Sequence, residues 1–129
     1  MKIPTENQEA EQLANWLKVN NYLFTHIANE SGLPPKVAML SAIRKKRMGL
    51  SPGVPDFMII LKQGSLLFIE LKRQRRVLKN GKLWASPSTI SEEQKVWVRE
   101  LEKIDNVWAV ICYGGDEAIK MVEMADGII

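Results

Sequence analysis

Three polar residues lie at the ends of two apolar segments in the middle of the chain. Asp56 precedes the run FMIIL, and Glu70 and Lys72 lie at the end of the run LLFIELK. Two carboxylates and an amine that lie close together can bind a hard metal ion and activate water. The types and order of these residues therefore indicate a metal site that supports hydrolysis.

The positions of these residues depend on a β-hairpin predicted over 53–72. Its two apolar runs are separated by KQGS, and runs of this length beside a Gly-containing turn are typical of paired strands. Because strand side chains alternate between faces, Glu70 and Lys72 point one way and the apolar residues between and before them point the other. Asp56 begins the neighbouring strand. An alternative is a surface Glu–Lys pair with an unrelated Asp, which would contribute little.

Charge is unevenly distributed along the sequence. The 129 residues carry a formal net charge of +3, but segment 36–82 contains twelve of the 18 Lys and Arg and only two of the 15 Asp and Glu. Those two acids are Asp56 and Glu70. A basic surface attracts nucleic acid through its phosphates, with release of counterions. The distribution therefore predicts a polyanionic partner together with a bound cation.

Composition excludes several classes of protein. Cys112 is the only cysteine and His26 the only histidine, which argues against disulfides, cysteine zinc clusters and His-rich metal sites. There is no apolar run of transmembrane length, and the N-terminus is polar and acidic rather than signal-like. We expect one domain over residues 1–129, located in the cytoplasm, with no membrane partner.

Apolar periodicity and capping signals predict an α/β domain whose central mixed β-sheet is flanked by helices. The expected helices cover 5–19, 35–48, 91–104 and 114–127, and the expected strands cover 22–27, 57–61, 66–72 and 106–113. Between the third strand and the third helix, a basic loop or hairpin carries Trp84 and the tight-turn pair Asn80-Gly81.

The motif Pro55-Asp56 followed by Glu70-Leu71-Lys72 resembles the signature of the PD-(D/E)xK nuclease superfamily. The stretches GLSPGVPDF, IELK and SEEQKVW resemble more specifically the VRR-NUC family of virus-type replication–repair nucleases. The similarity extends from Pro4 to Ile119. It implies the restriction-endonuclease-like core of the superfamily, ordered αβββαβ, with the helix at 35–48 and the last helix as additions.

The resemblance assigns roles to the motif residues. Asp56, Glu70 and the Leu71 carbonyl would hold Mg²⁺, for which Mn²⁺ would substitute, and Lys72 would position the water or the phosphate. Gln94 would lie close to these residues, although Ser91-Glu92-Glu93-Gln94 is also a capping box. A glutamate on the first helix would help to hold the metal; we choose Glu9, with Glu6 as the second choice. Both are also ordinary acids for a helix N-terminus.

Basic residues on either side of the motif are candidates for DNA contact. Four consecutive cations end the second predicted helix, and five more follow the catalytic strand closely. The alternative interpretation is a solvated helix face and a surface loop. The candidate DNA-binding residues are Arg44, Lys46, Arg73, Arg75, Arg76, Lys79 and Lys82.

Together, the residues and the resemblance imply a Mg²⁺-dependent DNA endonuclease. The family further implies a homodimer that acts on branched DNA such as Holliday junctions, in phage or mobile-element replication and repair, in the cytoplasm of a bacterial or phage-infected cell. Two alternatives are a catalytically silent nucleic-acid-binding module and a sequence-specific restriction-type endonuclease. The intact Asp56, Glu70 and Lys72 argue against the first, and the short chain argues against the second.

Overall fold

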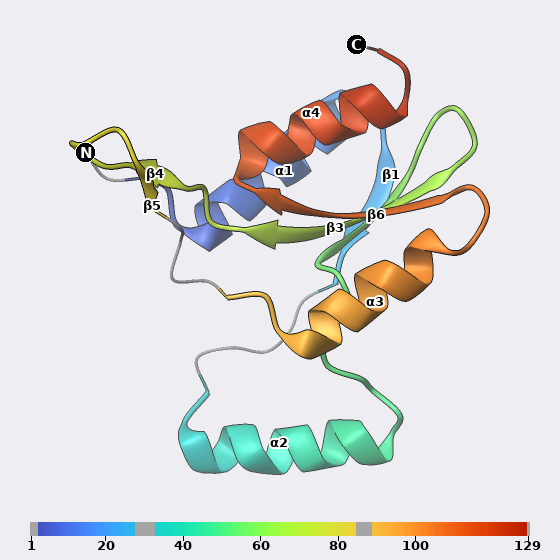
Figure 1. Cartoon of the computed structure of the whole chain (residues 1–129). Coiled ribbons are helices and arrows are strands. Elements are labelled where there is room, and N and C mark those ends of the chain that lie inside the picture. The colour runs from blue at the N-terminus through green and yellow to red at the C-terminus, as the bar shows by residue number, and fades with distance from the viewer. Residues whose placement is uncertain (1–2, 28–32, 85–88, 129) are drawn as a thin grey trace.

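The helices and strands occur in the order that the sequence predicts. The computed structural model describes residues 3–27, 33–84 and 89–128. Figure 1 shows the elements along the chain. They are α1 (Glu6–Val19), β1 (Leu23–His26), α2 (Pro35–Arg47), β2 (Phe57–Ile60), β3 (Leu66–Lys72), β4 (Arg76–Val77), β5 (Leu83–Trp84), α3 (Glu92–Glu102), β6 (Val107–Tyr113) and α4 (Gly115–Ala125).

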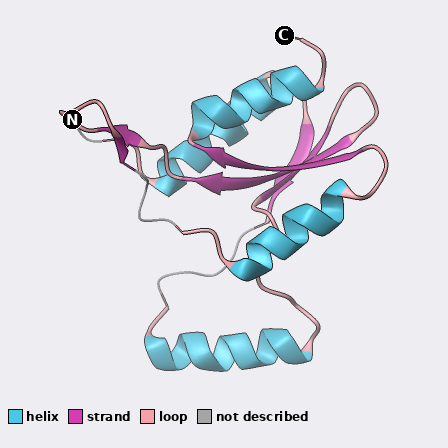
Figure 2. Ribbon diagram, viewed as in Figure 1, coloured by secondary structure: helices cyan, strands magenta, loops and turns pink. Residues whose placement is uncertain are grey.

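The central sheet is mixed, as expected. Its strand order is β1-β2-β3-β6, in which β1, β2 and β3 pair antiparallel and β3 pairs parallel with β6 (Figure 2). The predicted hairpin is formed by β2 and β3, and Phe57 of β2 lies opposite Ile69 of β3. The basic segment after β3 forms a separate two-stranded hairpin, β4–β5, with Gly81 in its turn at a φ of 80°.

The two faces of the sheet are covered by different helices. Helices α1 and α4 lie together on one face and α3 lies on the other (Figure 1). The core forms where α1 and α4 meet β3, and its fully buried side chains include Leu13, Leu17, Val122, Leu67 and Ile69. Since residues of a strand alternate between faces, Glu70 and Lys72 point toward the α3 side.

None of the residues of helix α2 is buried, as is also true of α3. It begins at Pro35, as expected, since a proline at the first helical position costs no hydrogen bond. Four of its large apolar residues are between 46% and 60% exposed: Val37, Met39, Leu40 and Ile43. Figure 1 shows α2 apart from the sheet, beyond α3. In the part of the chain that the structure describes, no helix is long and apolar enough to span a membrane.

Candidate active site

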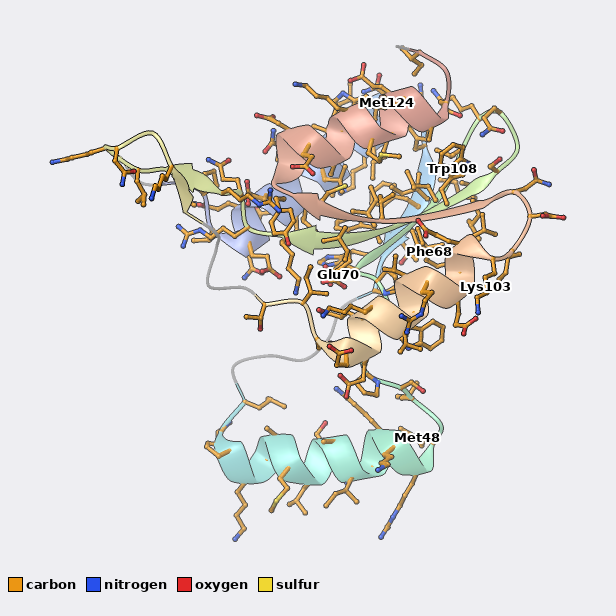
Figure 3. All side chains as sticks on the ribbon, viewed as in Figure 1. Met48, Phe68, Glu70, Lys103, Trp108 and Met124 are labelled. Carbon is orange, nitrogen blue, oxygen red and sulfur yellow. The ribbon has the colours of Figure 1, made fainter. Side chains whose placement is uncertain are left out.

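The structure brings Glu70, Lys72 and Asp56 together at one edge of β3, as the sequence predicts. Glu70 is 3% exposed and Lys72 is 6% exposed, and Lys72 Nζ lies 3.5 Å from Glu70 Oε2. Asp56 immediately precedes β2, and its Oδ2 accepts a hydrogen bond of 2.8 Å from the Leu71 N–H. Figure 3 shows Glu70 between the sheet and α3. Two carboxylates and an ammonium therefore meet in one buried site.

The orientation of Asp56 follows from where β2 begins, directly after it in the chain. The β2–β3 ladder stops at the pair Phe57 and Ile69, so Leu71 has no strand partner on that side. The Asp56 carboxylate takes the place of the missing partner and accepts the Leu71 N–H. Because the N–H and C=O of one strand residue point to the same side, the Leu71 carbonyl points toward the same edge. The backbone thereby fixes Asp56 beside Glu70.

The environment of Glu70 disfavours its charged form. Burial, followed by the neighbouring Asp56 carboxylate, raises the pKa of this carboxyl group to about 8, although the Lys72 ammonium acts in the opposite direction. Two neighbouring carboxylates repel each other in a poorly solvated site, and a cation bound between them removes that repulsion. The donors present therefore fit a hard divalent cation.

Gln94 links this site to the start of α3. Its side-chain N–H donates to Glu70 Oε2 at 3.1 Å, and its side-chain oxygen accepts from the Ser91 N–H at 2.9 Å. The Gln94 backbone N–H in turn donates to the Ser91 hydroxyl at 3.1 Å. The structure therefore contains both features expected of Gln94, a capping box and a contact with Glu70.

Two further contacts at the site were not expected from the sequence. The Lys72 ammonium donates to the Thr89 carbonyl at 3.2 Å, which adds a second fixed acceptor for this cation. Gly53 packs its backbone onto the start of α3, where a Cβ would lie 2.6 Å from the Glu93 carbonyl carbon. Any backbone carbonyl can serve as an acceptor, so no residue type signals the first contact. The glycine in the GVPD motif is a signal for the second.

Glu9 does not join the two motif carboxylates. Within the described residues, no group of three or more Asp, Glu, His or Cys side chains is arranged to hold a metal ion. Glu9 is 1% exposed, and its carboxylate accepts from the Gln74 N–H at 2.8 Å. Burial raises its pKa, whereas hydrogen bonds from the Gln74 and Gly115 backbones act in the opposite direction. The expected metal role of Glu9 is therefore corrected to an anchor between α1 and the segment after β3. Glu6 is exposed at the start of α1.

The candidate DNA-binding cations divide into two groups. Arg73 donates to the Pro4 carbonyl at 2.6 Å and to the Ile3 carbonyl at 2.8 Å, so its guanidinium is engaged within the protein. Arg75 lies 3.9 Å above the Tyr113 ring, although it is exposed. The remaining candidates with described side chains are exposed, namely Arg44, Lys46, Lys79 and Lys82. The Arg76 side chain lies outside the described part of the structure.

Comparisons with known proteins agree with this geometry. The family model "VRR-NUC domain" matches residues 4–116. A solved structure described as a "VRR_NUC domain protein" has 23% sequence identity and a TM-score of 0.60, covering 97% of this chain and 90% of that chain. At that identity, it shows the fold. A comparison with curated proteins gives no match. The family match, extending over most of the chain, shows that this protein belongs to the VRR-NUC family of the PD-(D/E)xK nuclease superfamily.

Proposed function

We propose that this chain is a Mg²⁺-dependent DNA endonuclease that hydrolyses phosphodiester bonds. The observation that carries the proposal is the convergence of Asp56, Glu70 and Lys72, with the Leu71 N–H fixing the first of them. A buried Glu–Lys pair beside a second carboxylate is not explained by folding stability, because removing charges from water costs free energy. Such an arrangement is typical of a site retained for chemistry.

The metal would be held by few protein ligands. Mg²⁺ keeps several waters and is commonly bound through one or two carboxylates together with substrate phosphates. Asp56, Glu70 and the Leu71 carbonyl supply that share, and Mn²⁺ is expected to substitute. When bound, the ion would lower the pKa of a water molecule and neutralise charge on the phosphate. Glu9 is left out of this set because, among the described residues, it forms no metal-binding group with Asp56 and Glu70.

Lys72 and Gln94 are proposed to hold the charged groups of the site in position. The Lys72 ammonium lies within reach of both Glu70 Oε2 and the Thr89 carbonyl, so it is held in one place. A fixed cation can stabilise the negative charge that develops on the attacked phosphate, without reorganising during the reaction. Gln94 holds one Glu70 oxygen, which leaves the other oxygen for the metal.

Branched DNA is the substrate that we propose, and a homodimer is the proposed active form. Exposed cations on α2 and on the β4–β5 hairpin supply phosphate contacts that carry no sequence information. Two copies would allow both strands of a junction to be cut. Phage or mobile-element replication and repair is the setting that the family suggests.

The test compares a four-way DNA junction with a linear duplex of the same sequence, each incubated with Mg²⁺ and with EDTA. We expect metal-dependent cutting of the junction and slower cutting of the duplex. Cutting at one fixed sequence in the duplex would support a restriction-type enzyme instead. Salt-sensitive binding of both DNAs without cutting in Mg²⁺ or Mn²⁺ would support the silent binding module.

A further inference from the structure

A cleft of about 820 Å³ opens between α2, the segment that leads into β2, and α3. Its walls include Ile27, Ala38, Ala42, Val54 and Trp97 and are mainly apolar. This volume lies in the range of roughly 300–1,000 Å³ that is typical of sites for small organic groups. No local pattern predicts this cleft, because it depends on where α2 lies relative to the rest of the chain.

The cleft adjoins the active site in three ways. Trp97 follows Gln94 by three residues, so both lie on the same face of α3, one turn apart. Val54 precedes Asp56 by two residues along the chain. The Ile27 N–H donates to the Asp56 carbonyl at 2.5 Å. A group in the cleft would therefore lie next to a phosphate bound at Asp56 and Glu70.

The chemistry of the cleft suits a nucleotide. Trp97 is half-buried and presents an aromatic ring, while Lys45 and Lys46 bring positive charge to the α2 wall. The same wall also carries the small residues Ala38 and Ser41, which cannot fill the space. An aromatic face stacks on a base of any sequence, and nearby lysines attract its phosphates. The apolar walls and Trp97 thus complement the base of a nucleotide, and the positive charge on the α2 wall complements its phosphate.

We propose that this cleft binds an unpaired nucleotide of the DNA substrate beside the phosphate that is cut, with its base stacked on Trp97. This inference rests on the proposed endonuclease function and deepens it. Bases within a duplex are stacked on each other, and extruding one costs free energy, so an unpaired nucleotide enters the cleft at the lowest cost. Stacking is interrupted at a branch point, so a nucleotide there is unpaired and extruded at lower cost than one inside a continuous duplex. The cleft would therefore give the enzyme its preference for branched over continuous DNA.

Binding can be tested separately from cleavage by working in EDTA. The full chain would be titrated against a continuous duplex and against the same duplex carrying a three-nucleotide bulge. We expect tighter binding to the bulged DNA. Trp97→Ala should lose roughly 5- to 150-fold in affinity for the bulged DNA and little for the duplex, since one base stack is lost. Trp97→Phe should retain most of the preference.

Trp108→Ala is the matched control, because Trp108 is a partly exposed tryptophan on β6 outside the cleft. It should leave both affinities unchanged. If Trp97→Ala fails to give a cooperative thermal transition, Trp97→Leu fills the same space without an aromatic face, and its comparison with Trp97→Phe decides. Equal preference for bulged DNA in Trp97→Leu and Trp97→Phe would overturn the inference.

Two other outcomes separate this inference from the proposed function. If the wild type binds and cuts junctions but shows no preference for bulged over continuous DNA, the cleft inference fails and the endonuclease proposal stands. If the wild type binds neither DNA, both fail. If Trp97→Ala instead converts a dimer to a monomer in sedimentation, the cleft belongs to an interface between copies, and the inference is overturned.

Discussion

The side chain of Gln94 connects the N-terminus of α3 with Glu70 at the centre of the site. One end of its amide donates to Glu70 Oε2 at 3.1 Å, and the other end accepts from the Ser91 N–H at 2.9 Å. The same residue therefore starts a helix and orients a buried carboxylate. Because the two functions use different atoms, substitutions can separate them.

We expect Gln94→Glu to keep the helix cap but to reduce cleavage. A Glu oxygen can still accept from the Ser91 N–H, whereas it cannot donate to Glu70 and adds a like charge beside it. Loss of an orienting partner of this kind typically costs about 10- to 100-fold in metal affinity or activity. The measurement is the cleavage rate as a function of Mg²⁺ concentration, together with the melting temperature.

Ser91→Ala is the control for the Gln94 substitution. It removes the cap hydroxyl and should cost about 1 kcal/mol of stability, while cleavage stays close to that of the wild type. If Ser91→Ala reduces cleavage as much as Gln94→Glu does, Gln94 acts only by starting α3.

The raised pKa of Glu70 predicts a pH dependence of stability in the metal-free protein. The folded state keeps a proton on Glu70 up to about pH 8, while the unfolded chain releases it near the ordinary value of 4.5. Because the folded state binds more protons in this window, the free energy of unfolding should fall as the pH rises from about 5 to 8. Urea unfolding in EDTA at several pH values measures the fall.

Glu70→Gln should flatten this pH profile, because its amide does not titrate. It should also make the metal-free protein more stable than the wild type above about pH 8, where the wild type holds two adjacent carboxylates. Mg²⁺ should stabilise the wild type more at pH 8 than at pH 6, since metal binding requires the ionised carboxylate. Parallel pH profiles for the wild type and Glu70→Gln would contradict this account of the site.

Substitutions at Glu9 distinguish a structural anchor from a metal ligand. Glu9→Gln keeps one oxygen that can accept the Gln74 N–H and loses at most the Gly115 bond, so we expect a smaller loss of stability than in Glu9→Ala and nearly unchanged cleavage. Glu9→Ala leaves a buried N–H without its partner and should cost about 1–3 kcal/mol of stability. If Glu9→Gln folds normally but cuts about 100-fold more slowly, Glu9 is a ligand after all. Chemical denaturation and single-turnover cleavage give the two readouts.

The cations of the β4–β5 hairpin should affect DNA affinity without affecting stability. Lys79 and Lys82 are exposed beside its turn, so replacing both by Ala should weaken binding and reduce the salt slope by about 1–2. Arg73→Ala is the contrasting variant, because its guanidinium bonds to the Ile3 and Pro4 carbonyls. It should lower the melting temperature and leave the salt slope unchanged. A salt slope that falls only with Arg73→Ala would reverse these assignments.

Much of this site could be predicted because its signals are local in the sequence. Alternation along β3 separates Glu70 and Lys72 from the apolar core face, and the turn KQGS brings Asp56 opposite them. The capping box at Ser91 likewise depends on residues three apart. In each case, the residue types and their spacing determine the local geometry, so the sequence pattern was sufficient to predict it.

The parts that could not be predicted depend on contacts between distant segments. Glu9 bonds to Gln74, 65 residues away, and Arg73 bonds to Pro4, 69 residues away. A buried glutamate is equally compatible with a metal and with backbone N–H groups, so its residue type does not decide between them. The position of α2 was also beyond prediction, because its apolar residues suggest packing and yet none is buried.

The most direct test of the central claim is single-turnover cleavage of a four-way junction by the wild type and by Lys72→Ala, with DNA affinity measured separately in EDTA. We expect Lys72→Ala to bind the junction with unchanged affinity and to cut it about 100- to 1,000-fold more slowly, as is typical when one preorganised charge-stabilising group is lost. Cutting at the wild-type rate by Lys72→Ala would show that the Asp56, Glu70 and Lys72 site does not perform the reaction.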